Sequence, residues 1–400
     1  MTDFSTEAPR YRSFWCAYSC SLLGRFVHGM ALSWLVWQFT KSPLWLALIA
    51  LLSALPSLPM APIAGVVADR FLRHHILLVT QSLGCLIAGA TAWFAFQGTL
   101  TPVVLAVLAL LFGIVTSIDG PSMHSMLVET GETVEQAVAR QSLVMNVSRA
   151  VAPMIAVAIM EWTSPGWCFV FNTLAFLPMI LIMAIVKIPN KTTQEERKES
   201  LKMSSLRLFK EYRVLREVLP QIACLSIFVM PAVSLLPAIS LKDAALMSFG
   251  SMSSGLGFGA IMAAILMQRE KRLIRAVTTV LVAGWICSIA FAVLPALESL
   301  ISQWICAAIA GGALTFSLAS ANNAIQSRAP NMYRGRFSAM FLAVMLGLVP
   351  IGQLVVGFAA ELIGSQTAVR VCAIAAMILM VLSSSLVGNK EGRSEQKKEG

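Results

Sequence analysis

Three ionisable side chains lie inside long apolar stretches of the chain. They are Arg25, Asp119 and Arg149. A charged side chain at the centre of a lipid bilayer costs about 3 kcal/mol or more unless it faces a water-filled cavity or an opposite charge. These three residues are therefore the first candidates for binding a substrate or a proton.

His28 follows Arg25 by about one helical turn, so the two side chains are predicted to share one face of a helix. A histidine can change its charge near neutral pH, which makes His28 a candidate for proton coupling. Two structural alternatives stay open. Arg25 and Asp119 could form an ion pair that only ties two helices together, and His28 could be a packing residue that is satisfied by a hydrogen bond.

Uncharged polar residues within apolar stretches are further candidates for contacts with a substrate. They are Asn146, Asn322, Asn323 and Gln326. The second half of the chain has almost no charge inside its apolar stretches, so we expect the coupling residues to lie in the first half.

The composition excludes a soluble protein. Of the 400 residues, 57% are hydrophobic and 12% are charged, and the mean hydropathy is +0.76. This leaves too little polar surface to cover a soluble globule of this size. The net charge of +10 does not indicate nucleic-acid binding, because the basic residues fall between apolar runs and form no face with interleaved aromatics.

Catalytic and metal-binding patterns are not found in the sequence. There is no H-E-x-x-H motif and no pair of carboxylates within the apolar stretches, so an enzyme embedded in the membrane is not expected. The eight cysteines lie in apolar runs without a C-x-x-C pair, and we interpret them as reduced packing residues. No metal and no other cofactor is expected.

Twelve apolar runs have about the 20 residues that a membrane-spanning helix needs. Six lie in the first half, at residues 12–39, 43–68, 75–96, 101–126, 137–160 and 166–187. Six lie in the second half, at residues 219–240, 246–267, 274–296, 300–325, 337–362 and 367–388. The predicted fold is an all-α membrane protein with twelve transmembrane helices in two six-helix bundles.

The distribution of Lys and Arg predicts the orientation. With the N-terminus inside, the inward segments receive most of these residues, and the outward side receives only Lys41, Lys242 and Arg370. We therefore expect a multi-pass membrane protein with both termini cytoplasmic. The expected domains are a bundle at 1–187, a cytoplasmic linker with an amphipathic helix at 188–218, a bundle at 219–388 and a tail at 389–400.

The end of the second predicted helix reads GVVADRFLRH over residues 65–74. This stretch resembles the loop motif between helices two and three of the major facilitator superfamily. The resemblance implies a cytoplasmic gating latch between the two bundles, formed by Gly65, Asp69, Arg70 and Arg73. It also implies that helices one and four line the central cavity, so that Arg25 and Asp119 face water and substrate.

A second match covers Asp119-Gly120-Pro121 and the stretch from Arg140 to Pro153. It resembles the bacterial efflux branch that includes the enterobactin exporter and macrolide efflux proteins, which implies a multi-pass protein of the bacterial cytoplasmic (inner) membrane. Arg149 and Pro153 are similar to the ends of the antiporter motif of drug:proton exchangers, which implies proton antiport. In the corresponding hypothesis, an anionic substrate binds the arginine and frees Asp119 to bind a proton.

The leading interpretation is a secondary active transporter that works by alternating access and exports an amphipathic, anionic small molecule such as a siderophore. Two arginines against one carboxylate favour an anionic cargo. The alternatives are a multidrug or macrolide efflux pump, a siderophore importer and a lysophospholipid flippase. The expected partners are the small-molecule substrate, protons and membrane lipid, with no nucleic acid, and the expected state is a monomer.

Overall fold

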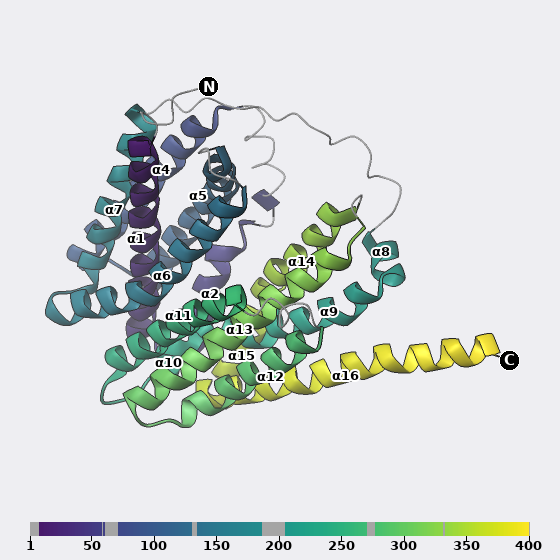
Figure 1. Cartoon of the computed structure of the whole chain (residues 1–400). Coiled ribbons are helices and arrows are strands. Elements are labelled where there is room, and N and C mark those ends of the chain that lie inside the picture. Colours follow the sequence, from purple (N-terminus) through teal and green to yellow (C-terminus); the bar gives the residue numbers. More distant parts are fainter. Residues whose placement is uncertain are drawn as a thin grey trace, which may run out of the picture.

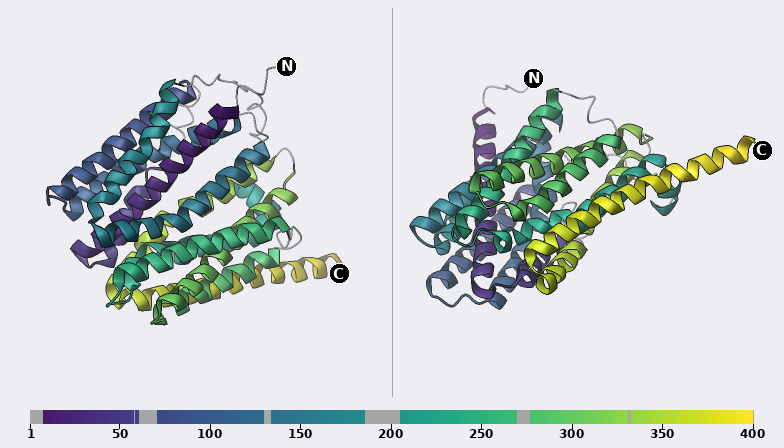
Figure 2. Two further views of the ribbon diagram at one scale, coloured as in Figure 1. Left: turned by 60° about the vertical axis from the view of Figure 1, so that its left-hand side comes forward. Right: turned by 90° about the horizontal axis from the view of Figure 1, so that it is seen from below.

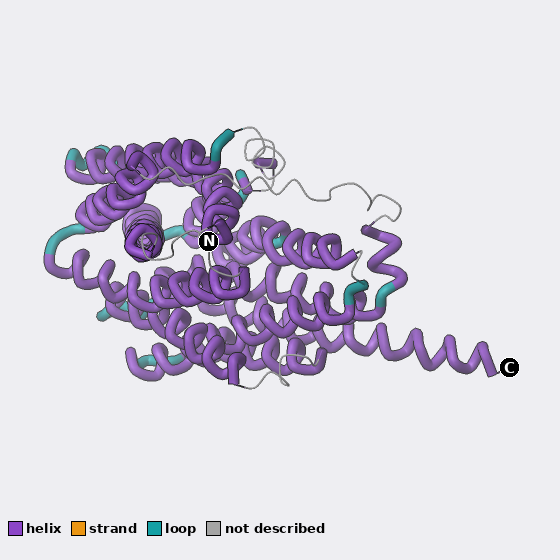
Figure 3. Tube along the Cα trace, turned by 45° about the horizontal axis from the view of Figure 1, so that its top comes forward, coloured by secondary structure: helices purple, strands orange, loops and turns teal. Residues whose placement is uncertain are grey.

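The computed structural model describes residues 8–57, 59–60, 71–129, 134–185, 205–269, 277–330 and 333–399, and this part of the chain is helical without a strand. The all-α fold is thereby confirmed. The helices form two groups, with the earlier part of the chain in one and the later part in the other (Figure 1). Only short turns connect most consecutive helices (Figure 3).

The described helices of the first half are α1 (Ala8–Thr40), α2 (Pro43–Ala54), α4 (Arg73–Phe96), α5 (Pro102–Glu129), α6 (Val134–Trp162) and α7 (Pro165–Ile185). Three of them begin with a proline, whose fixed φ angle and missing N–H suit the first turn of a helix. The side chain of Ser42 caps α2 by accepting a hydrogen bond from the backbone N–H of Trp45 at 3.4 Å.

The second half begins with the short helix α8 (Ser205–Glu211). Its further helices are α9 (Arg213–Cys224), η1 (Leu225–Val229), η2 (Met230–Leu235), α10 (Leu236–Ile239), α11 (Ala245–Arg269), α12 (Val277–Val293), η4 (Leu294–Ala296), α13 (Leu300–Arg328), α14 (Arg334–Gly347), α15 (Val349–Ile363) and α16 (Ser365–Glu399). The segments from α9 to α10 follow one another directly and form one span, Arg213–Ile239.

Ten segments of the described chain are long and apolar enough to cross a membrane. α1 is long enough but is not among them, because Arg25 and His28 interrupt its apolar residues. α2 is described over 12 residues, and residues 61–70 lie outside the described part. The count of twelve spans therefore stays a prediction.

Several helix pairs join the halves, and two of these contacts are the most extensive. α6 packs against α11, and α2 packs against α15. Glycines allow the close approach: a Cβ atom added at Gly257 would collide with the backbone of Ala150, and one added at Gly357 would collide with Ala47. The two groups of helices lie next to each other in both views of Figure 2.

Two spans of the second half are irregular. The span from Arg213 changes from α-helix to a π-helical turn at η1 and then to a 3-10 turn at η2, and prolines 231 and 237 lie at the starts of η2 and α10. The next-to-last span is divided at Leu348 into α14 and α15, just before Pro350. Ser234 donates a hydrogen bond of 2.8 Å to Gln353 and so ties the two irregular spans together.

The halves are also joined at the end that carries the turn between α1 and α2, which is the end predicted to face outward. The side chain of Ser42 donates a hydrogen bond of 2.8 Å to Glu361, and the ring of Trp34 stacks on Phe249 with centroids 6.1 Å apart. At the opposite end, α14 packs against α9, α13 and α15 of its own half.

The predicted domain bounds are not tested by the structure and stay a prediction. α9 begins at Arg213, within the range 188–218 that was expected for the linker, and α16 continues through the expected tail to Glu399. In Figure 1 this last helix, in yellow, extends away from the other helices.

Candidate substrate and proton site

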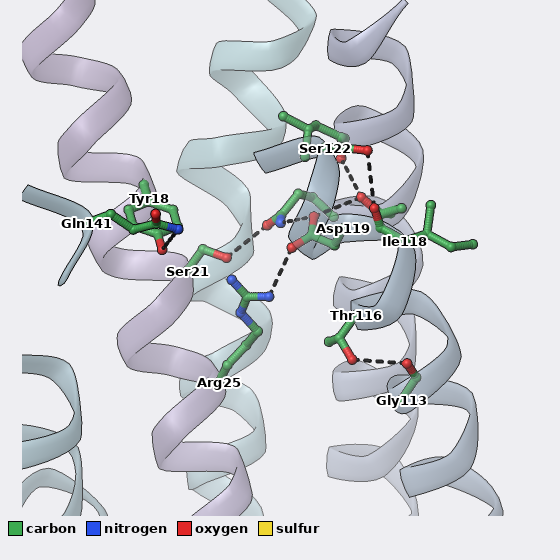
Figure 4. A network of polar contacts seen from close by, with 12 residues as sticks. Tyr18, Ser21, Arg25, Gly113, Thr116, Ile118, Asp119, Ser122 and Gln141 are labelled. Carbon is green, nitrogen blue, oxygen red and sulfur yellow. Dashed lines mark hydrogen bonds and ion pairs between the residues drawn. The ribbon is translucent and has the colours of Figure 1, made fainter. Parts of the chain in front are cut away.

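Arg25 and Asp119 form an ion pair between α1 and α5. The Nη1 atom of Arg25 donates a hydrogen bond of 2.9 Å to Oδ2 of Asp119, and the two side chains are 17% and 3% exposed. Figure 4 shows the guanidinium turned toward the carboxylate. The pairing compensates part of the cost of placing two charges inside the bundle.

The second carboxylate oxygen of Asp119 is held by α4. Oδ1 accepts hydrogen bonds from Oγ1 of Thr80 at 2.9 Å and from Nε2 of Gln81 at 2.8 Å. Ser21 of α1 donates a hydrogen bond of 2.8 Å to Oε1 of Gln81, which fixes the amide orientation. Asp119 therefore receives three hydrogen bonds, a number that suits an ionised carboxylate in a buried place.

Sequence reasoning missed Thr80, Gln81 and Ser21. The signal that could have found two of them is the adjacent polar pair Thr80-Gln81 in the middle of an apolar run at 75–96. Nothing in the sequence pairs this run with Asp119, because the pairing depends on how α4 packs against α5.

A cavity of about 330 Å³ lies beside the ion pair. It is lined by Tyr18, Leu22, Arg25, Phe26, Ser53, Phe112, Gly113, Thr116, Asp119, Gly120, Met123, Gln141 and Met145. Its volume is at the lower end of the range of small-molecule sites, about 300 to 1,000 Å³. The lining mixes aromatic and aliphatic walls with one anion and one cation, which suits an amphipathic ligand.

Further polar groups line this cavity. Gln141 of α6 donates a hydrogen bond of 3.4 Å to the hydroxyl of Tyr18. The Nε atom of Arg25 is buried and has no hydrogen-bond partner among the described residues. An acceptor group of a ligand could bind this unused donor.

His28 lies apart from the cavity. Its ring is 4% exposed, stacks on Phe112 with centroids 5.0 Å apart and meets the edge of Phe169 at 4.7 Å. His28 is three residues after Arg25, which corresponds to a rotation of about 300° around the helix axis and so leaves the two side chains about 60° apart. This difference is enough to point His28 between α5 and α7. The expected common face with Arg25 therefore does not bring His28 into the hydrogen-bonded group.

Arg149, Asn146 and Pro153 lie on α6, near its contact with α11. The guanidinium of Arg149 lies 5.9 Å from the ring centroid of Phe26, and Asn146 donates a hydrogen bond of 3.4 Å to Ser142. A Cβ atom at Gly250 would meet Val157 and approach the carbonyl of Pro153. The antiporter-like stretch thus lies where the two halves touch.

Asn322, Asn323 and Gln326 are half-buried on α13, and Gln326 donates a hydrogen bond of 2.9 Å to Asn322. They do not line the cavity beside Arg25.

The latch residues Gly65, Asp69 and Arg70 lie outside the described residues. Arg73 begins α4, but its side chain is not described either. The latch stays a prediction. Within the described ranges, no group of three His, Cys, Asp or Glu residues lies close enough together to hold a metal ion.

A family model of transmembrane secretion effectors matches residues 4–398, nearly the whole chain. The chain belongs to this family of the major facilitator superfamily. It is therefore a multi-pass membrane transporter. The family assignment confirms the resemblance that the motifs at 65–74 and 119–153 indicated.

Among curated proteins, this transporter is similar to the Staphyloferrin A transporter of Staphylococcus aureus, with 21% identity over 358 residues that cover 86% of this chain and 87% of the relative.

Two solved structures share its fold. A bacterial homologue of the human lysosomal transporter Spinster, inward-facing and unoccupied, has a TM-score of 0.67 at 15% identity and covers 96% of this chain and 97% of its own. A bacterial homologue of the iron transporter ferroportin, inward-facing, has a TM-score of 0.69 at 13% identity, with coverage of 94% and 99%.

Proposed function

We propose that this transporter exports an amphipathic, anionic small molecule of the siderophore class across the inner membrane, in exchange for protons. The observation that carries the proposal is the Arg25 and Asp119 ion pair in the wall of a cavity whose other walls are aromatic and aliphatic. The description of the family as secretion effectors supports export. The relative that is named for staphyloferrin A supports a siderophore as cargo.

Arg25 is the proposed contact for the anionic group of the substrate. It points one nitrogen at Asp119 and keeps its buried Nε without a partner among the described residues. A carboxylate or catecholate can bind Nε and the neighbouring Nη2 of the guanidinium together, which gives a stronger and more directional contact than a single hydrogen bond. The anionic group of the substrate then competes with Asp119 for the charge of Arg25 and weakens the ion pair.

Whether protons and substrate move in the same direction or in opposite directions depends on what happens to Asp119 when the substrate binds Arg25. If the substrate only removes Arg25, the released carboxylate gains affinity for a proton, and by linkage the proton and the substrate help each other to bind. That arrangement would carry both in the same direction. Exchange requires that a bound proton and a bound substrate exclude each other.

A hydrogen-bond donor on the substrate supplies this exclusion. A hydroxyl or amide that binds the ionised carboxylate of Asp119 occupies the oxygen that a proton would take, so protonation displaces the substrate. The proposed cargo therefore carries an anionic group next to a donor group, as a hydroxycarboxylate or a catechol does. Thr80 and Gln81 keep Asp119 in place throughout, because they bind its other oxygen.

The described conformation fits the inward-facing state of such a cycle. The halves are joined by Ser42 with Glu361 and by Trp34 with Phe249 at the end predicted to face outward. The structurally similar Spinster and ferroportin homologues are also inward-facing. A transporter in this state takes up its substrate from the cytoplasm, as export requires.

The test is the siderophore content of spent medium from iron-starved cells with and without this gene. Cells without it should retain the siderophore inside and secrete little. Restoration by the wild-type gene and by Glu161→Gln, an exposed carboxylate on α6, but not by Asp119→Asn, would support the proposal. Unchanged secretion without the gene would overturn the siderophore assignment and leave drug efflux or lipid transport.

A second measurement tests whether substrate and protons are exchanged or move together. Substrate affinity of the purified protein should rise with pH if protons and substrate exclude each other. Affinity that rises as pH falls would contradict exchange and favour import together with protons.

A further inference from the structure

A second polar cavity lies in the other half of the molecule, away from Arg25 and Asp119. Its volume is about 540 Å³. It is lined by Arg213, Val214, Glu217, Gln221, Val277, Thr278, Leu281, Arg328 and Ser384. These residues come from α9, α12, α13 and α16, which pack against one another in the second half. The proposed substrate route does not use this cavity.

The cavity lies at the inward membrane boundary. Arg213 begins the span Arg213–Ile239, and Arg328 ends the span Leu300–Arg328. Both are the inward ends of their helices in the predicted orientation. This is the level at which the phosphates of the inner leaflet lie, and basic residues near helix ends attract them.

One wall of the cavity is a polar stripe on α9. Arg213, Glu217 and Gln221 follow one another at intervals of four residues and so lie on one face of the helix. Arg213 donates a hydrogen bond of 2.6 Å to Glu217. Gln221 lies about 12 Å deeper along the helix than Arg213. α12 contributes Val277 and Leu281, so the lining includes apolar as well as polar side chains.

Gln221 has an unsatisfied polar atom. The residue is 1% exposed, and its Oε1 atom is buried without a hydrogen-bond partner among the described residues. Since buried polar groups are almost always paired, a buried acceptor in the wall of a cavity points to a donor that comes from a ligand.

The charges of the residues that line the cavity indicate which class of ligand it binds. Among the described residues, two guanidinium groups and one carboxylate line the cavity, which leaves an excess of one positive charge. A phosphodiester with a neutral hydroxyl-bearing headgroup carries one negative charge and offers a donor. A headgroup with its own ammonium has no net charge and does not balance the excess.

We propose that this cavity binds an anionic phospholipid of the inner leaflet whose headgroup combines a phosphodiester with a hydroxyl, as phosphatidylglycerol does. Arg328 binds the phosphate, and the headgroup folds back into the cavity, where its hydroxyl donates to Oε1 of Gln221. One acyl chain covers Val277 and Leu281. The bound lipid joins α9, α12, α13 and α16 at their inward ends and so stabilises the second half.

The experiment is native mass spectrometry of the full-length protein in detergent, with phosphatidylglycerol or phosphatidylethanolamine of the same acyl chains. We expect phosphatidylglycerol to bind about fivefold better. Arg328→Gln should lower its binding about fivefold, the factor expected for one arginine at the membrane surface. Gln221→Leu should also lower it about fivefold, the factor expected for one lost hydrogen bond. Arg370→Gln, an exposed arginine on α16 on the side predicted to face outward, is the matched control and should bind like wild type.

Three results would overturn the proposal. Equal binding of the two lipids would remove the preference for an anionic headgroup, and unchanged binding by Arg328→Gln would place the lipid elsewhere. Displacement of phosphatidylglycerol by inorganic phosphate or glycerol phosphate would assign the cavity to a soluble phosphate. The melting temperature of each variant identifies loss of fold, and Arg328→Gln changes an exposed side chain, so the test does not depend on Gln221→Leu alone.

Discussion

The guanidinium of Arg25 donates a hydrogen bond of 2.9 Å to the carboxylate of Asp119, although the two residues are 94 positions apart in the chain. The contact joins α1 to α5 inside the first half and lies in the wall of the cavity. Whether it is a structural tie or part of transport is decided by variants that remove one charge or both.

Single variants Arg25→Gln and Asp119→Asn should each lower stability by about 3 to 5 kcal/mol, because each leaves an uncompensated charge. The double variant Arg25→Gln with Asp119→Asn removes both charges and should recover most of that stability. We expect it to remain inactive in reconstituted vesicles, since substrate and proton then lack their contacts. Recovery of transport together with stability would show that the pair is only structural.

His28→Phe should retain the fold and transport. The ring lies between Phe112 and Phe169, and a phenyl group keeps those aromatic contacts. A swap of similar volume in a packed place costs less than about 1.5 kcal/mol, so the melting temperature should change little. The measurement is the pH profile of transport. A flattened profile in His28→Phe would return this residue to the coupling mechanism.

Gly257→Ala should separate α6 from α11. A Cβ atom there would collide with the backbone of Ala150 in the other half, and backbone cannot move aside as a flexible side chain can. Overpacking of this kind costs about 1 to 3 kcal/mol. We expect a lower melting temperature and slower transport. Gly29→Ala on α1 is the control, since the space around its Cβ is open, and it should be neutral or stabilising.

Glu361→Ala should weaken closure of the end that is predicted to face outward. The carboxylate accepts hydrogen bonds from the Ser42 side chain at 2.8 Å and from the backbone N–H of Leu44 at 3.3 Å, at the start of α2. Exposed contacts of this kind contribute up to about 1 kcal/mol, which corresponds to a shift of about fivefold in the conformational equilibrium.

The check on Glu361→Ala is the rate at which a cysteine at Thr116, in the cavity wall, reacts with a membrane-impermeant thiol reagent from outside the cell. The rate should rise in Glu361→Ala and stay unchanged in Glu298→Ala, which removes an exposed carboxylate between η4 and α13. An equal rate in both variants would mean that the contact does not hold this end closed.

The sequence by itself determined that lipid is the solvent and that the chain is helical. Apolar runs of membrane length with Lys and Arg between them can only be satisfied as helices in lipid, because lipid offers no partner for backbone N–H and C=O groups. Hydropathy and helical periodicity can be predicted because both depend only on residues that are close together in the sequence. For the same reason Arg25 and Asp119 could be recognised as costly residues before their partners were known.

Only the tertiary structure decided which groups meet. Thr80 and Gln81 bind Asp119 because α4 packs against α5, and the rotation of α1 places Arg25 at the cavity and His28 between two aromatic rings. The division of the next-to-last span at Leu348 was not predicted either, since Pro350 within an apolar run is compatible with a kinked or a continuous helix. Such choices depend on packing between helices that are far apart in the chain, and no local pattern records them.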